Sequence, residues 1–117
     1  MGTSSSRALL CLCLTDSTLE SNGRLLDLHG ASVDIAELRA DCLGEGELEA
    51  LGRFAAARAE RLILTVRRRA DGGRWAEGEE ARAAVIARAL RSGAFAYVDL
   101  EDDFDPPSVR ESLAGAA

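Results

Sequence analysis

Short apolar runs alternate with segments of helical periodicity along the whole chain. The pattern predicts strands over residues 9–15, 32–39, 61–67 and 96–101. It predicts helices over residues 18–28, 47–59 and 78–92, and a last helix that opens at residues 105–107. Because each strand is followed by a helix, the chain is expected to form an α/β fold with a parallel sheet.

The expected helix ends carry residues that suit them. Asp16 or Ser17 can cap the first helix, which we expect to end at Gly30. Gly93 closes the third helix, and Asp105 followed by proline is a typical start for the last one. These signals support the division into four strand–helix units.

Four βα units are half of a (β/α)8 barrel, the TIM-barrel fold. A complete barrel typically needs about 250 residues, whereas this chain has 117. An open, doubly wound sheet of four strands is the alternative architecture. No Gly-x-Gly-x-x-Gly segment follows the first strand, which argues against the dinucleotide-binding version of that alternative.

The charged residues exclude several classes of function. The net charge of −6 argues against nucleic acid or a membrane surface as a partner, since both attract basic patches. All 14 cationic residues are arginine, and His29 is the only histidine. Chemistry that needs a lysine imine therefore cannot be completed by this chain. No run approaches the roughly 20 apolar residues of a membrane span, and we expect a cytoplasmic location.

Cys11, Cys13 and Cys42 are the three cysteines, and their spacing matches neither a zinc site nor a disulfide framework. We expect reduced thiols and no bound metal. Cys11 and Cys13 lie two apart in an apolar run, where small buried core residues are the simplest interpretation.

Each predicted strand has one face that becomes polar toward its C-terminal end. Residues two apart share a face, which places Glu37 and Arg39 on the second strand, Arg67 on the third and Glu101 on the fourth. Asp71 follows in the next loop. Active sites of (β/α)8 enzymes lie at this end, so these side chains are expected to converge there. They could equally be structural ion pairs, and the pattern alone does not separate the two.

Three segments resemble motifs of one enzyme family. Residues 36–41 read Ala-Glu-Leu-Arg-Ala-Asp, residues 65–73 read Thr-Val-Arg-Arg-Arg-Ala-Asp-Gly-Gly, and residues 97–101 read Tyr-Val-Asp-Leu-Glu. In order and spacing they resemble the second-, third- and fourth-strand motifs of type I 3-dehydroquinate dehydratases. The flanking residues are most similar to forms fused to a shikimate dehydrogenase.

The resemblance implies a lyase of the shikimate pathway, which leads to the aromatic amino acids. Members convert 3-dehydroquinate to 3-dehydroshikimate through a lysine imine, or Schiff base, and a histidine, with no cofactor. By position, Glu37, Arg39 and Arg67 match substrate-binding residues, and Asp71 stands where the family has a glutamate that orients the histidine. Cys13 takes the place of a serine found in some members.

The matched family carries its catalytic histidine and lysine on later strands. His29 is predicted at a helix C-terminus, at the opposite end of the sheet. We therefore expect one domain, residues 1–117, that is the truncated N-terminal half of such a barrel. Cys13 and Glu101 would line a pocket for the small-molecule substrate, and the chain alone would be inactive. A homodimer or a complementary C-terminal half would complete the barrel. The alternative is a non-catalytic α/β module that binds a ligand or another protein.

Overall fold

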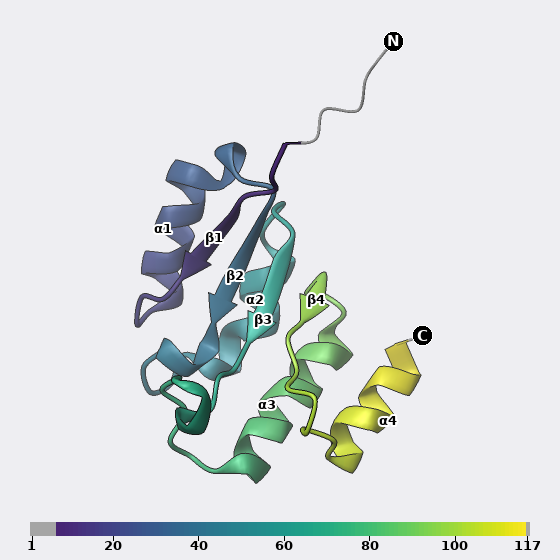
Figure 1. Cartoon of the computed structure of the whole chain (residues 1–117). Coiled ribbons are helices and arrows are strands. Elements are labelled where there is room, and N and C mark those ends of the chain that lie inside the picture. Colours follow the sequence, from purple (N-terminus) through teal and green to yellow (C-terminus); the bar gives the residue numbers. More distant parts are fainter. Residues whose placement is uncertain (1–6, 117) are drawn as a thin grey trace.

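The computed structural model describes residues 7–116, which form one parallel four-stranded sheet with helices packed against it (Figure 1). The strands are β1 (Cys11–Leu14), β2 (Ile35–Arg39), β3 (Leu62–Thr65) and β4 (Tyr97–Val98). The helices are α1 (Leu19–His29), α2 (Leu51–Ala56), α3 (Glu79–Ser92) and α4 (Pro107–Ala116). Within the described residues, no helix combines the length and apolar character needed to cross a membrane.

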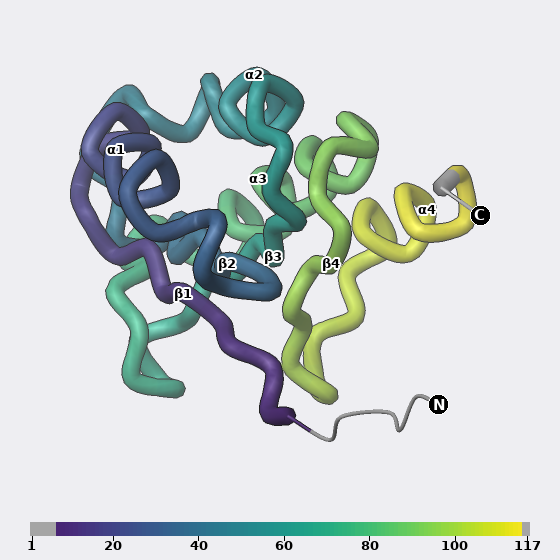
Figure 2. Tube along the Cα trace, turned by 90° about the horizontal axis from the view of Figure 1, so that it is seen from above, coloured from purple at the N-terminus to yellow at the C-terminus, as the bar shows by residue number. Residues whose placement is uncertain are grey.

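The strands follow one another in sequence order across the sheet, from β1 to β4 (Figure 2). Connections between neighbouring parallel strands are right-handed, so crossovers that always step in the same direction place every helix on the same face. A doubly wound sheet reverses its strand order and has helices on both faces. The order therefore confirms the half-barrel expected from the sequence and excludes the alternative architecture.

Alternation along the strands separates the two faces of the sheet. Leu14, Leu38 and Leu64 are 0% exposed because they point toward the helices, where they form the centre of the core. The residues that alternate with these leucines along each strand point to the opposite face of the sheet, which no helix of the described chain covers. One row across this open face consists of Cys13, Glu37, Ile63 and Tyr97, which are register partners on successive strands.

The prediction that Cys11 and Cys13 are buried is wrong. Both thiols are free and exposed, while Cys42 is partly buried and also free. The strand pattern was interpreted correctly, but the side chains alternate onto the open face rather than onto the helix-covered one. An apolar run alone does not tell which of its two faces has a cover.

Two helix caps differ from the expectation. The Thr18 hydroxyl caps α1 by accepting from the backbone N–H of Ser21 at 3.1 Å, whereas Asp16 accepts from the Ser21 hydroxyl. Helix α4 begins at Pro107, one residue later than predicted, and the carboxylate of Asp105 pairs with Arg110 at 2.9 Å. Each cap therefore lies one or two residues later in the sequence than predicted. In both cases the predicted capping aspartate binds another side chain instead, Ser21 for Asp16 and Arg110 for Asp105.

Helix α2 is shorter than the predicted 47–59 segment. A 3-10 turn over Leu48–Ala50 precedes it, and it ends at Ala56. Arg58 then turns toward α1, where its guanidinium donates to Asp27 at 2.6 Å and to the carbonyl of Gly23 at 3.3 Å. These contacts with another element outweigh the helical propensity of the alanine-rich segment.

A buried arginine joins the end of the sheet to α3. The Arg82 side chain is 0% exposed and donates to the carbonyl of Val66 at 2.8 Å. It also pairs with Glu79 at 2.7 Å and Glu101 at 2.9 Å, and its guanidinium lies 4.3 Å from the centre of the Phe104 ring. All polar atoms of this buried group are thereby satisfied, and the segment after β4 is attached to α3.

Replacing Arg82 with methionine should lower the free energy of unfolding by roughly 3 kcal/mol, because it removes one partner of a buried ion pair. Urea denaturation followed by circular dichroism measures the change. Arg24→Met on α1 is the matched control, since Arg24 is exposed and, among residues 7–116, pairs only with Glu20, and it should cost less than about 0.5 kcal/mol. Equal losses in both variants would show that the Arg82 network does not hold β3, α3 and the segment after β4 together.

Candidate functional site

Glu37 lies at the centre of the open face, on β2 between two neighbouring strands. Its carboxylate accepts a hydrogen bond from the Thr65 hydroxyl at 2.7 Å and a weak one from the Cys13 thiol at 3.6 Å. Partial burial and the neighbouring Glu37 charge raise the pKa of that thiol. Cys13 is thus a neutral donor beside Glu37 and not an activated nucleophile.

Arg39 follows two residues later on the same face and is held rigidly. Its guanidinium donates to both carboxylate oxygens of Asp41, at 2.9 and 2.6 Å. The Asp41 side chain is 0% exposed and also accepts from the backbone N–H of Arg74 at 2.9 Å. Burial by itself would raise the pKa of Asp41, but these hydrogen bonds outweigh it and the pKa is lowered. The buried carboxylate therefore stays charged and fixes the direction of Arg39.

Arg67 lies just beyond β3 and is less constrained. Its guanidinium makes one described ion pair, to Asp99 at 2.9 Å, and both side chains are partly open to solvent. A partner this exposed contributes little to stability, so a ligand carboxylate can compete for the same arginine.

Asp71 closes the short 3-10 turn Arg69–Asp71 that follows β3. Its carboxylate accepts from Arg68 at 2.7 Å, and this bond, together with the charge of Arg67, lowers the pKa of Asp71. Asp71 is therefore a charged acceptor paired with Arg68 in the loop after β3, and its convergence with Glu37, Arg39 and Arg67 stays a prediction.

Gly73 brings that loop back against the end of β3. A Cβ atom on Gly73 would lie 2.2 Å from the carbonyl oxygen of Arg67. The backbone of Trp75 also bonds to this carbonyl, at 3.2 Å. Since the closest neighbour is backbone, no rearrangement of a side chain could make room, and the loop can pack this tightly only with glycine at the position.

Glu101 is not where the sequence led us to expect it. Strand β4 ends at Val98, and the Glu101 carboxylate points to Arg82 on α3. The Arg68 guanidinium lies 3.9 Å from the same carboxylate. The Glu101 side chain is only 17% exposed. Because Glu101 pairs with the buried Arg82, its side chain does not lie on the open face, and Glu101 has a structural role here.

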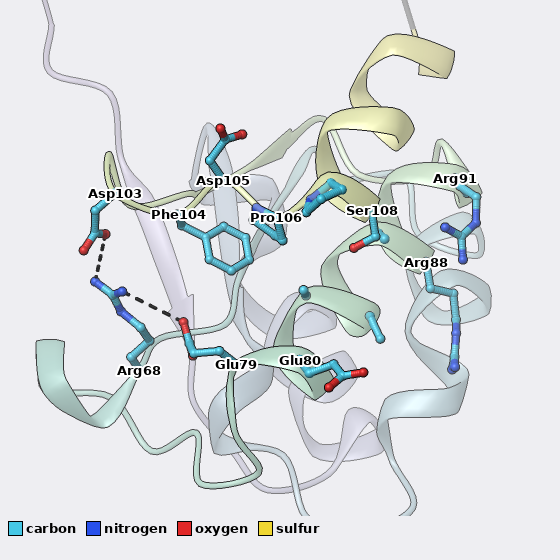
Figure 3. Close-up of a pocket in the computed structure, with 14 residues that line it drawn as sticks. Arg68, Glu79, Glu80, Arg88, Arg91, Asp103, Phe104, Asp105, Pro106 and Ser108 are labelled. Atoms are coloured by element: carbon cyan, nitrogen blue, oxygen red, sulfur yellow. Dashed lines mark hydrogen bonds and ion pairs between the residues drawn. The ribbon is translucent and has the colours of Figure 1, made fainter.

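A separate groove of 720 Å³ lies between α3, α4 and the segment before α4 (Figure 3). Arg68 borders one end, where it pairs with Asp103 at 3.2 Å and lies 3.9 Å from Glu79. Alanines of α3 and the Phe104 ring form part of its lining. The groove contains none of Glu37, Arg39 and Arg67, so size alone does not locate the candidate site.

Comparison with known proteins decides the family. A family model described as type I 3-dehydroquinase matches residues 10–116. The chain belongs to the type I 3-dehydroquinate dehydratase family. The three motifs at the ends of the predicted strands had indicated this family, and the match confirms it.

Two curated relatives are named 3-dehydroquinate dehydratase. The one from Syntrophobacter fumaroxidans is 34% identical over 101 residues, which cover 82% of this chain and 42% of the relative. The one from Desulfotalea psychrophila is 36% identical over 93 residues, which cover 79% of this chain and 38% of the relative. The chain therefore spans less than half the length of the relatives it matches.

A solved structure shows the same fold. The type I 3-dehydroquinate dehydratase from Clostridium difficile superimposes with a TM-score of 0.75 at 17% identity. The match covers 94% of this chain and 46% of that one. The four βα units thus correspond to half of a dehydratase barrel.

Sequence reasoning missed two polar residues that organise this dehydratase half-barrel. Thr65 was noted only as part of a motif, yet it is 2% exposed and fixes Glu37. Arg82 was not singled out, although it is fully buried. Its position, three residues after Glu79 in α3, was the available signal, since such a spacing places the two on one helix face. In the described part of the chain, no cluster of three histidine, cysteine, aspartate or glutamate side chains could hold a metal ion.

The Asp41–Arg39 pair should give a recognisable pH dependence. The folded pKa of Asp41 lies below its ordinary value of 3.8, so its contribution is present above about pH 4 and is lost as the pH falls through the folded pKa. We expect Asp41→Asn to lower the free energy of unfolding by about 2 kcal/mol at pH 7 and by clearly less at pH 3. Urea titrations at both values measure this. The control Glu20→Gln changes a side chain that is 82% exposed and should lower the free energy of unfolding by less than about 0.5 kcal/mol at pH 7. A penalty for Asp41→Asn that is the same at both pH values would contradict the electrostatic account.

Proposed function

We propose that this chain forms the substrate-binding half of a type I 3-dehydroquinate dehydratase and binds 3-dehydroquinate without converting it on its own. The observation that carries the proposal is the placement of Glu37, Arg39 and Arg67 on one open face, at the carboxyl ends of adjacent strands. In (β/α)8 enzymes this end of the sheet holds the active site.

The three side chains suit a hydroxylated carboxylate. Arg67 offers a planar fork of donors to the substrate carboxylate, in exchange for its exposed partner Asp99. Arg39 keeps N–H groups beyond those bound to Asp41, and Glu37 can accept from a substrate hydroxyl. Because Asp41 and Thr65 already orient Arg39 and Glu37, little side-chain entropy is lost when a ligand binds.

The chemical step needs groups that this chain does not carry. In the family a lysine forms an imine with the substrate ketone and a histidine removes the proton. The sequence contains no lysine, and His29 lies in the last turn of α1, at the amino end of the sheet. Asp71 would orient a histidine supplied by another segment. We infer that residues 1–117 act as one domain that is equivalent to the N-terminal half of the enzyme. We also infer a location in the cytoplasm, where free thiols such as those of this chain stay reduced.

Binding should depend on Arg67. Titration calorimetry with 3-dehydroquinate should show a single weak site, and Arg67→Ala should lower the affinity at least tenfold because it removes the charged donor for the carboxylate. Arg24→Ala is the control, since Arg24 is an arginine of α1 far from the open face. If the substrate binds equally well to both variants, the open face is not its site. If it binds to neither variant nor to the unmodified chain, the non-catalytic interaction module becomes the better interpretation.

The isolated chain should not produce 3-dehydroshikimate. The ultraviolet absorbance of the product follows the reaction. Treatment with borohydride in the presence of substrate should leave no substrate adduct on an internal side chain, because no lysine is present to form a reducible imine. Turnover by the pure chain that disappears in Arg67→Ala would refute this expectation.

A further inference from the structure

The two free edges of the sheet carry most of the large apolar side chains that the described residues expose. Five such residues are exposed, and three of them lie at these edges: Leu9 at 77%, Leu10 at 54% and Tyr97 at 52%. Leu9 and Leu10 lead into β1, and Tyr97 begins β4. Exposed apolar surface concentrated in this way is typical of an interface.

Both edges lack the charged residues and prolines that often prevent strands from pairing, although β4 is only two residues long. Residues 9–14 and 94–98 contain no charged residue and no proline. The carbonyl of Leu10 accepts from the backbone of Asp34 at 2.9 Å. In a parallel ladder, every second residue of a strand bonds to the same neighbouring strand, so the backbone groups of Leu12 and Leu14 also bond to β2. The backbone groups of Cys11 and Cys13 therefore point away from β2, toward the free edge.

We propose that two copies of this chain close into one eight-stranded barrel, with β4 of each copy beside β1 of the other. All four strands run in the same direction, so β4 and the partner's β1 can pair in parallel. A two-fold axis along the barrel then forms both junctions at once and leaves no free edge. The chain matches 46% of the barrel-forming relative, so two copies contain nearly all the elements that one barrel requires.

The second copy also completes the site. Because the two-fold axis runs along the barrel, the carboxyl ends of all eight strands meet at one mouth. That mouth contains Glu37, Arg39 and Arg67 from both copies, and the open face of each chain becomes the interior. One 3-dehydroquinate would then bind per two chains; this statement of stoichiometry rests on the proposed function, whereas the dimer itself does not.

Sedimentation velocity at 1–100 µM tests the dimer without any ligand. We expect the unmodified chain to be a dimer over most of this range and Cys11→Glu to be monomeric, because the closed barrel would enclose the new negative charge at the junction with the partner's β4. Cys11 is exposed, so the same substitution is harmless to a single chain, which circular dichroism verifies. The control Leu28→Glu changes a residue of α1 that is 74% exposed and should leave the dimer intact. A monomer throughout, or a dimer that survives Cys11→Glu, overturns the proposal.

A cross-link tests which edges meet. Tyr97→Cys places a thiol on the open face of β4, on the opposite edge from Cys11 and Cys13. A short bismaleimide should join it to Cys11 or Cys13 of another chain, as peptide mapping would show, and the unmodified chain should give no such product. Links only between two copies of position 97, or between two copies of Cys11, would mean that like edges meet and that the barrel does not close as proposed. Arg67→Ala should dimerise normally, so a failure of ligand binding can be distinguished from a failure of assembly.

Discussion

The common direction of the four strands is the constraint on which the rest of the structure depends. It brings the carboxyl ends of all strands to one edge, and it requires every connection to cross back over the sheet. Because the connections step across the sheet in one direction, the helices cover a single face. Polar residues two apart near the ends of the strands therefore gather on the remaining face, and the same topology leaves that face without a cover.

The sequence predicted the order and type of the elements, since both depend on local periodicity. It predicted their lengths less well, because lengths depend on partners that are distant in sequence. Strand β4 is a clear case: residues 96–101 have the pattern of a strand, but only Tyr97–Val98 forms one, and the backbone contact with β3 ends where the Asp99 N–H donates to the Leu64 carbonyl. Glu101, three residues further on, is drawn to the buried Arg82. In the same way Arg58 ends α2 by contacting α1. Neither contact leaves a trace in the local hydrophobic pattern.

The candidate site was predicted residue by residue only as far as strand alternation reaches. Alternation located Glu37, Arg39 and Arg67 on one face, but it could not tell a fixed arginine from an available one. The structure separates them through their partners. Arg39 donates two hydrogen bonds to Asp41, which is 0% exposed, and Arg82 donates two to Glu101, which is 17% exposed, whereas Asp99, the partner of Arg67 among the described residues, is 47% exposed. Burial of the partner, which is a tertiary property, decides which arginine can exchange its carboxylate for a ligand.

Gly73 shows how a position without a side chain can be as demanding as any catalytic one. Its backbone φ is not in the left-handed region, so conformational freedom does not explain the residue. The Arg67 carbonyl occupies the space where a Cβ would lie. A backbone packed this closely leaves room for glycine alone, so the position would look invariant among homologues in the same way as a residue that touches substrate. Invariance at Gly73 would then result from the lack of space for a Cβ atom and not from a role in substrate recognition.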